Sequence, residues 1–344
     1  MELHEITIRP LGAMGTALRG DTIFGQYCWQ VAYDSSLVQD GLEINVSRYH
    51  EKPFVVFSSG FPRFEPQPGT ITYAMKRPDL PLSWIFPCHG KDQASSVRER
   101  KKNKARKWML VGADLALKAS KMEYIDDGAL LKRFLKQTPG STEEYDAAHV
   151  LASFSQPHNT INRSTGTTGS GEFAPYSQNV GFYHPGLTIA IFALIDTEVT
   201  DIGNVQTGLT RMGQFGFGKD ASIGLGRFSV EATWPLSFPE VGCSTAVYCM
   251  APSVPAGESY REAYFLPFVR FGKHGDSLAC SGNPFKNPVI MADEGAVFVP
   301  KEEAALRRPY WGKDVTNVSL SQPETIVQGY SICLPIGIDA GGEI

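Results

Sequence analysis

The amino-acid sequence predicts an α+β protein, and three observations support this fold class. The first 235 residues carry apolar patterns in the order strand, helix, strands, helix, strand. That order is typical of a ferredoxin-like βαββαβ unit, here with a long insertion over about residues 60–175. Residues 236–344 are richer in short strands and prolines, which predicts a second domain that begins between Pro235 and Pro239. A chain of 344 residues is long enough for about two such domains.

The first domain begins with a strand, a helix and a second strand. Alternating apolar and polar residues predict a strand over residues 3–10. Apolar residues at helical spacing predict a helix over residues 21–33, with Asp21 as its N-cap. The stretch FVVFSS (54–59) predicts the second strand, which we expect to end at the Gly/Pro cluster of residues 60–69.

The insertion mixes irregular and helical patterns. Three prolines predict an irregular arm over residues 78–90, and helical spacing predicts helices over 128–137 and 142–153. Residues 98–107 (RERKKNKARK) contain seven cations and one acid, which predicts an exposed surface. Residues 158–173 (HNTINRSTGTTGSGEF) predict a polar loop.

A glycine-rich loop, residues 213–226, follows the last helix of the first domain. LTIAIFALID (187–196) predicts a buried strand, residues 198–213 a helix and residues 227–234 a strand. The spacing of Gly213, Gly218 and Lys219 nearly matches a P-loop, but Asp220 occupies the position where a P-loop carries Ser or Thr. A P-loop also joins a strand to a helix, which is the reverse order. The loop is therefore not expected to bind a nucleotide for hydrolysis.

Composition and charge exclude several classes of protein. A hydrophobic content of 42% with 20% charged residues indicates a folded globular chain. The net charge of −4 argues against a free nucleic-acid binder, although a subunit of a larger assembly can carry such a charge. Six cysteines without CxxC spacing predict buried reduced thiols, and no metal site or cofactor is expected. The absence of a signal-peptide pattern and of a long apolar run predicts a soluble cytoplasmic protein that does not contact membranes.

Three segments carry candidate binding residues, and each has an alternative structural interpretation. His158, Asn159, Asn162 and Arg163 offer donors to phosphates and base edges, although Asn side chains also stabilise turns. His158 could also act as a general acid or base, but no second His is near it in the sequence. The glycine-rich loop offers backbone N–H groups that can approach a ligand closely, or simply forms a tight connection.

The charged groups near these backbone N–H groups are Lys219 and Arg227, and Ser222 adds a hydroxyl. The basic run at 98–107 could contact phosphates or form a solvated face.

Five stretches in order along the chain resemble motifs of the RAMP superfamily of CRISPR-associated proteins. The chain is most similar to the fourth subunits of type III-A (Csm) effector complexes. The resembling stretches are GDTIFGQYCW, RERKKNKARKW, HNTINRSTG, GFGKDASIGLGRF and NPVIMADEGAVF, which lie between residues 20 and 298.

The resemblance implies two ferredoxin-like domains and a non-catalytic subunit, present once per complex, that binds the 5′ handle of the CRISPR RNA (crRNA). It implies contacts with the large polymerase-like subunit and with backbone RAMP subunits, without a cofactor. The residues and the resemblance together give these RNA-binding candidates: Arg19, Lys101, Lys102, Lys104, Arg106, His158, Asn159, Asn162, Arg163, Gly216, Gly218, Lys219, Ser222, Gly224, Gly226 and Arg227.

Three alternatives stay open at this point. A metal-independent RNA-processing endonuclease would use His158 or His184 as general base, with Lys219 or Arg227 stabilising charge. A backbone RAMP subunit would polymerise along the guide RNA. A β-rich two-domain protein would bind an unrelated ligand.

Overall fold

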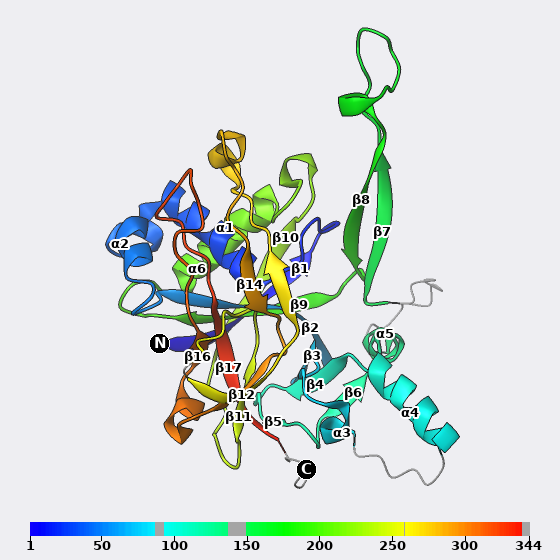
Figure 1. Cartoon of the computed structure of the whole chain (residues 1–344), viewed down its shortest axis with the longest axis vertical. Coiled ribbons are helices and arrows are strands. Elements are labelled where there is room, and N and C mark those ends of the chain that lie inside the picture. Colours follow the sequence, from blue (N-terminus) through cyan, green and yellow to red (C-terminus); the bar gives the residue numbers. More distant parts are fainter. Residues whose placement is uncertain (87–92, 137–148, 258, 339–344) are drawn as a thin grey trace.

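The computed structural model describes residues 1–86, 93–136, 149–257 and 259–338 (Figure 1). The predicted α+β class is confirmed, since helices pack on two large sheets whose strands are almost all antiparallel. Within the described ranges, no helix is long and apolar enough to cross a membrane.

The first sheet has seven strands in the order β10-β1-β9-β2-β3-β4-β6. Its first four strands have the 4-1-3-2 order of a ferredoxin-like unit, with α1 between the first two strands in sequence and α6 between the last two. The βαββαβ unit predicted from the sequence is therefore confirmed. The bounds are β1 (Glu2–Pro10), α1 (Gly20–Tyr33), β2 (Val55–Gln67), β3 (Thr70–Lys76), β4 (Trp108–Gly112), β6 (Glu123–Ile125), β9 (Thr188–Ile195), α6 (Ile202–Phe215) and β10 (Phe228–Leu236).

The two long helices cover one face of this sheet. Helix α1 buries Ile23, Phe24, Tyr27 and Val31, which share one side of the helix. Gly208 of α6 allows the Tyr27 ring to pack closely, because a Cβ at that glycine would lie 2.5 Å from Tyr27 Cε2. The contact fixes the distance between the two helices and therefore the position of the loop that follows α6.

The second sheet repeats the strand order of the first without its helices. Strands β17-β11-β15-β12 again run 4-1-3-2, and β16 and β5 extend the sheet beside β17. Among the described residues, no α-helix connects these strands, and the 3₁₀ helix η5 and strand β16 lie between β15 and β17. A separate hairpin, β13–β14, lies between β12 and β15. The bounds are β5 (Leu117–Lys118), β11 (Ala246–Cys249), β12 (Tyr260–Tyr264), β13 (Pro267–Arg270), η4 (Asp276–Cys280), β14 (Val289–Ala292), β15 (Val297–Pro300), η5 (Glu303–Arg307), β16 (Tyr310–Gly312) and β17 (Tyr330–Gly337).

The two sheets meet at a bulge in β2. The pairing of β2 with β9 shifts between Phe57 and Gly60. Gln328 Oε1 accepts from the Phe57 N–H, and Gln328 Nε2 donates to Phe57 O. The Ser59 N–H donates to Met250 O. One apolar core continues across both sheets. The predicted division of the chain at residues 235–239 stays a prediction.

The insertion adds strands to the first sheet and a long hairpin. Strands β7 and β8 pair along their whole length and extend away from the body of the molecule (Figure 1). The remaining elements are η1 (Ser35–Leu37), α2 (Gly41–Ser47), α3 (Leu82–Ile85), α4 (Gln93–Ala105), α5 (Asp127–Leu135), β7 (Leu151–His158), η2 (Gly171–Phe173), β8 (Tyr176–Tyr183) and η3 (Ala221–Ile223).

Several expectations about elements were wrong in detail. Strand β2 does not end at residue 59, because the bulge lets it continue to Gln67. Arg19, not Asp21, is the N-cap residue of α1, and the Asp21 carboxylate instead accepts from Arg270. The helix expected over 142–153 lies partly outside the described residues, and from Leu151 the chain is strand β7.

The expectation about cysteines holds only in part. Cys249 and Cys333 are buried free thiols, as predicted, whereas Cys243 and Cys280 are exposed. Cys88 lies outside the described residues.

Candidate nucleic-acid interface

The glycine-rich loop is held by contacts with its own backbone. A Cβ at Gly226 would lie 2.1 Å from Phe217 O, and a Cβ at Gly216 would lie 2.4 Å from Leu225 O. Both residues have a positive φ, 75° and 108° respectively, which favours glycine. Gly218 (φ 77°) packs on Thr16, whose Cβ would lie 2.5 Å from an added Cβ. These glycines therefore allow the loop to fold tightly. Among the loop glycines, only Gly224 has open space around its added Cβ.

The side chains of Thr16 and Gln26 fix the start of the glycine-rich loop. Gln26 of α1 donates to Gly216 O and accepts from the Gly218 N–H, both at 2.9 Å. The Lys219 N–H donates to Thr16 Oγ1 at 2.8 Å, and the Gly226 N–H donates to Ala13 O. The backbone N–H groups of Gly216, Gly218 and Gly226 are thus used inside the protein and cannot also bind a ligand.

The outer part of the loop keeps donors toward solvent. Lys219, Ser222 and Arg227 are exposed. Among the described residues, no acceptor binds the backbone N–H groups of Asp220, Ala221 or Ser222. The Lys219 ammonium lies 3.6 Å from the Asp220 carboxylate, while Arg227 has no carboxylate partner in the described part of the chain. The exposed tip can therefore donate to an anion such as a phosphate.

The β7–β8 hairpin turns an aromatic face toward this loop. Phe154 and Phe182 stack with ring centroids 4.7 Å apart, and His158 stacks on Tyr176 at 5.3 Å. The pairing places these rings on the same hairpin face as Gln178, because residues directly opposite each other share a face. Gln178 Nε2 donates to Asp220 Oδ2 of the glycine-rich loop at 2.8 Å. The rings and the loop tip therefore form one surface.

The base of the hairpin is anchored beside the same loop. Met14 and Gly181 exchange two backbone hydrogen bonds, at 2.7 and 2.9 Å. Met14 lies between Ala13 and Thr16, which contact the glycine-rich loop. The hairpin and the loop are thus held together by the segment between β1 and α1.

The polar tip of the hairpin carries the other predicted residues. Asn162 forms the turn itself, since its Oδ1 accepts from the Ser164 N–H at 2.9 Å and its backbone pairs with Thr167. Asn159 and Arg163 are exposed, and their side chains form no hydrogen bond or ion pair within the described residues. Asn162 therefore has a structural role, while Asn159 and Arg163 remain accessible to a ligand.

The two histidines considered for catalysis lie at opposite ends of the hairpin. His158 pairs with Tyr176 at the tip, and His184 follows Tyr183 at the base, a separation of about 25 Å along the strand. His184 is buried, packs on Phe134 and has its Nδ1 2.9 Å from Pro185 O. The two rings therefore cannot serve one catalytic site.

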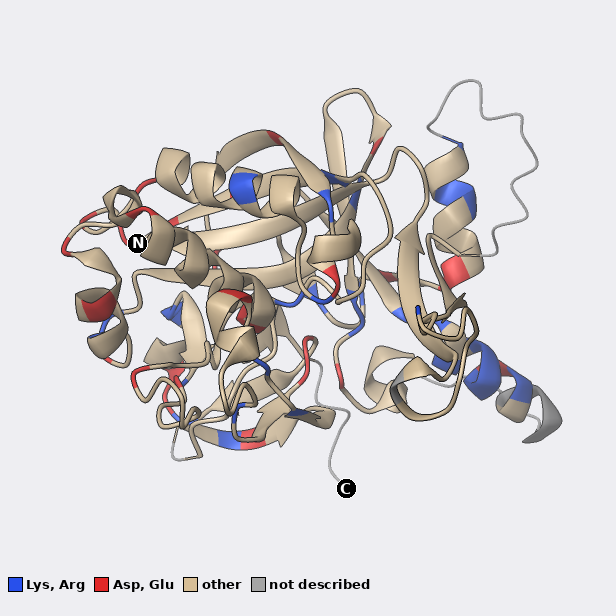
Figure 2. Cartoon of the chain, turned by 90° about the horizontal axis from the view of Figure 1, so that it is seen from above, with Lys and Arg blue, Asp and Glu red and all other residues tan. Residues whose placement is uncertain are grey.

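The basic run forms most of helix α4, at the edge of the molecule (Figure 2). Lys101, Lys102 and Lys104 are exposed there, and the Arg106 guanidinium lies 5.5 Å from the centre of the Phe86 ring. Arg77 Nη1 donates to the Asn103 and Arg106 carbonyl oxygens and closes the end of the helix. Helix α4 lies far from the loop between α6 and β10, so the two basic segments do not form one site (Figure 1).

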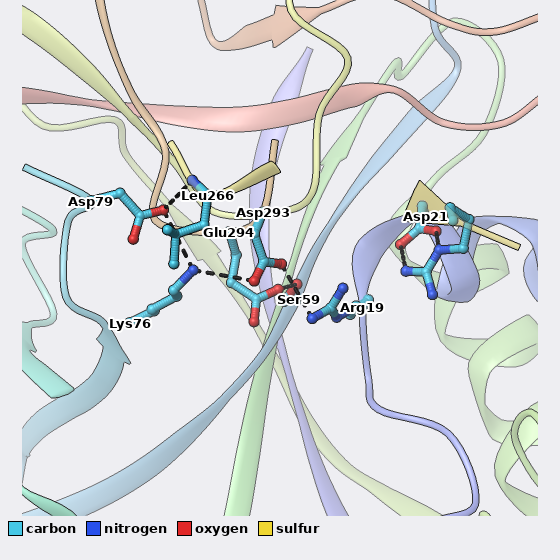
Figure 3. A network of polar contacts seen from close by, with 9 residues as sticks. Arg19, Asp21, Ser59, Lys76, Asp79, Leu266, Asp293 and Glu294 are labelled. Atoms are coloured by element: carbon cyan, nitrogen blue, oxygen red, sulfur yellow. Dashed lines mark hydrogen bonds and ion pairs between the residues drawn. The ribbon is translucent and has the colours of Figure 1, made fainter. Parts of the chain in front are cut away.

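Arg19 belongs to a network of ions at the junction of the two sheets (Figure 3). Its guanidinium lies 3.3 Å from Asp293 and 4.6 Å from the centre of the Phe268 ring. Lys76 lies 3.2 Å from Asp293 and 3.5 Å from Asp79. The expected phosphate contact of Arg19 stays a prediction, but its observed contacts link α1 to the turn between β14 and β15.

Glu294 is the unusual member of this network. Burial raises the pKa of Glu294, and the neighbouring Asp293 carboxylate adds to the effect. Its carboxylate accepts from Ser59 Oγ at 2.8 Å. A raised pKa means that the folded state binds the proton more tightly than the unfolded state. The contribution of Glu294 to the stability of the folded state is therefore present below the ordinary pKa of 4.5. It is lost as the pH rises through the pKa of Glu294 in the folded state.

We expect Glu294→Gln to stabilise the protein at neutral pH by about 1 kcal/mol, because a buried ionised group is removed while an oxygen still accepts from Ser59. Thermal unfolding measured across pH should show the gain shrinking as the pH falls toward 4.5. The exposed Glu240→Gln serves as the control and should change little. A gain that does not depend on pH would contradict this explanation.

Solved structures with the same architecture come from CRISPR complexes. A chain in the crystal structure of a Csm1–Csm4 cassette in complex with pppApA has a TM-score of 0.56 and 14% identity, covering 99% of this chain and 100% of that chain. A chain in the crystal structure of the Csm3–Csm4 subcomplex of the type III-A CRISPR-Cas interference complex has a TM-score of 0.55 and 10% identity, covering 97% and 99%. Csm4 is the component that the two assemblies share. The chain has a Csm4-like fold.

A further chain with this fold occurs in a Csm1–Csm4 cassette in complex with cA4, with a TM-score of 0.54 and 14% identity over 99% of this chain and 100% of that chain. No protein-family model and no curated protein matches the sequence. The fold that the resemblance implies is therefore confirmed.

Sequence reasoning missed the residues that assemble the interface. Thr16, Gln26 and Gln178 hold the glycine-rich loop, yet each is a single polar residue without a motif. Phe154 and Tyr176 fall in or beside a stretch that was expected to be helix or loop. The period-two alternation of LASFSQPH was the one local signal for a strand there.

Proposed function

We propose that this chain is a guide-RNA-binding subunit of a type III CRISPR effector ribonucleoprotein and that it holds the repeat-derived 5′ handle of the crRNA. The Csm4-like fold supports the assignment to such complexes. The single observation that carries RNA binding is the Gln178–Asp220 contact, which places the aromatic face of the hairpin beside the exposed tip of the glycine-rich loop.

This surface offers the two kinds of contact that single-stranded RNA needs. Phe154, His158 and Tyr176 present ring faces on which splayed bases can stack. Lys219 and Arg227 can pair with phosphates, aided by the unused N–H groups of residues 220–222. The net charge of −4 does not oppose this function, because RNA contacts depend on the local charges of the surface.

The partners follow from the same proposal. We expect a large Csm1-like subunit on one side of the chain and Csm3-like backbone subunits on the other, with one copy of this chain bridging them. Native mass spectrometry of the complex, purified with its neighbouring subunits, tests this arrangement. One copy together with one crRNA is expected, and several copies would instead support a backbone subunit that polymerises along the guide.

We propose that the chain does not cleave RNA. His184, one of the two candidate general bases, is buried and packs on Phe134, which leaves His158 as the histidine to test. Repeat RNA incubated with the purified protein in chelator should therefore stay intact. A product ending in a 2′,3′-cyclic phosphate that disappears in His158→Ala would overturn the proposal in favour of an RNA-processing endonuclease.

A further inference from the structure

The segment between β13 and β14, residues 271–288, exposes two aromatic rings. Phe271 is 76% exposed and Phe285 is 64% exposed. Lys273 pairs with Phe285 through a backbone bridge, and its ammonium lies 5.7 Å from the centre of that ring. Large apolar side chains with this exposure on a small hairpin indicate a contact surface rather than a packing position.

This segment is fixed against helix α1. Arg270 Nε lies 2.6 Å from Asp21 Oδ2, and Arg270 Nη2 donates to Asp21 Oδ1 at 2.8 Å. A Cβ at Gly275 would lie 3.6 Å from Trp29 Nε1, so the backbone passes beside the indole. The ion pair is bidentate and its carboxylate is buried, which holds the hairpin in a defined position.

The glycine-rich loop is fixed against the same part of α1 through Gln26. Thr22, Gly25, Gln26 and Trp29 are spaced so that they share one side of the helix. No atom of the described residues lies within 4 Å of a Cβ placed at Gly25, so the helix surface is open to them there. The glycine-rich loop and the segment 271–288 lie on the same side of the molecule, and helix α1 lies between them (Figure 1).

The charge of the segment suits an anion. Residues 266–291 contain three cations, Arg270, Lys273 and Lys286, and a single acid, Asp276. Arg270 is neutralised by Asp21, but Lys273 and Lys286 have no carboxylate within salt-bridge distance among the described residues. Lys273 is exposed and Lys286 is half-buried. Burial lowers the pKa of Lys286, while Cys28 and Asp21 oppose this effect.

We infer that Phe271 and Phe285 form a second base-stacking platform, on which single-stranded RNA continues after it crosses α1 from the glycine-rich loop. Lys273 and Lys286 hold the phosphates beside the two rings. The inference rests on the proposed function, because it extends the RNA surface of the glycine-rich loop. Val269 and Ile290 on the same hairpin are exposed too. Lys273 and Lys286 near the two rings nevertheless favour RNA over a partner protein as the ligand.

Photo-crosslinking of the purified full chain to single-stranded RNA with photoreactive uridines tests the inference. Crosslinked peptides are expected both from residues 219–227 and from residues 271–286. Phe271→Ala with Phe285→Ala should weaken binding of a long RNA by about fivefold to a hundredfold per ring, and should spare a short RNA that reaches only the glycine-rich loop. Trp234→Ala, which removes an exposed ring on β10, is the matched control.

The outcomes separate the inference from the proposed function. Crosslinks to residues 219–227 alone would overturn the second platform and leave the proposed function standing. Absence of any RNA binding would overturn both. If the two Phe substitutions leave RNA affinity unchanged but release a subunit from the complex in native mass spectrometry, the surface binds protein and the inference is wrong.

Discussion

Gly226→Ala is expected to destabilise the protein by about 2–5 kcal/mol and to abolish RNA binding by the glycine-rich loop. Gly226 has a φ of 75°, and its added Cβ would lie 2.1 Å from Phe217 O. The left-handed backbone costs about 1–2 kcal/mol for a residue with a Cβ, and the clash with a backbone atom adds to that cost. The loop cannot keep its fold without moving Phe217.

Gly224→Ala is the matched control for this prediction. Gly224 also has a positive φ, 97°, but no atom lies within 4 Å of its added Cβ. The free energy of unfolding of the Gly224→Ala variant should therefore fall only by the cost of the left-handed backbone, about 1–2 kcal/mol. Denaturant unfolding and RNA titration of both variants make the comparison. Equal losses of stability in the two would show that the close backbone approach at Gly226 has no role.

Removal of the hairpin rings is expected to give the second large effect. Phe154→Ala with Tyr176→Ala should cost about 1–3 kcal/mol of RNA binding free energy for each base that loses its stacking partner. The side chains are 47% and 49% exposed on a hairpin that extends from the body, so the stability of the protein should hardly change.

Trp234→Ala is a suitable control for the ring prediction, since this ring is 52% exposed on β10. Fluorescence anisotropy with labelled single-stranded RNA measures the affinities of the unsubstituted chain, the hairpin variant and the control. If the hairpin variant and the control bind RNA equally well, bases do not stack on the hairpin.

Much of the first sheet and of the two helices that cover it could be predicted because their periodicity is local. The strand alternation over residues 3–10 and the helical spacing in α1 and α6 each reflect one face packed on one core. The hairpin was harder, since the spacing over 142–153 predicts a helix, whereas Leu151–His158 pairs with β8 and forms a strand. Local pattern cannot reveal such a partner.

The candidate site itself stays a prediction, and the structure changes the role expected of the loop glycines. Glycines of the loop were expected to bring backbone N–H groups to a ligand, but Gly216, Gly218 and Gly226 serve the tight fold of the loop itself. Their conformation follows from contacts with Phe217, Leu225 and Thr16, which the sequence alone does not bring together. Lys219, Ser222 and Arg227 do lie on the exposed side of the loop.

The salt dependence of RNA binding tests the central claim, that the tip of the glycine-rich loop holds RNA phosphates, most directly. The affinity of the full chain for handle-containing single-stranded RNA is measured over a range of salt concentrations. Lys219→Ala with Arg227→Ala should weaken binding and reduce the slope of log affinity against log salt by about 0.7 for each phosphate that the variant no longer neutralises.

Lys121→Ala with Lys301→Ala removes two exposed cations elsewhere and should leave the slope unchanged. An unchanged slope in the Lys219/Arg227 variant, or an equal reduction of the slope in both variants, would contradict the account.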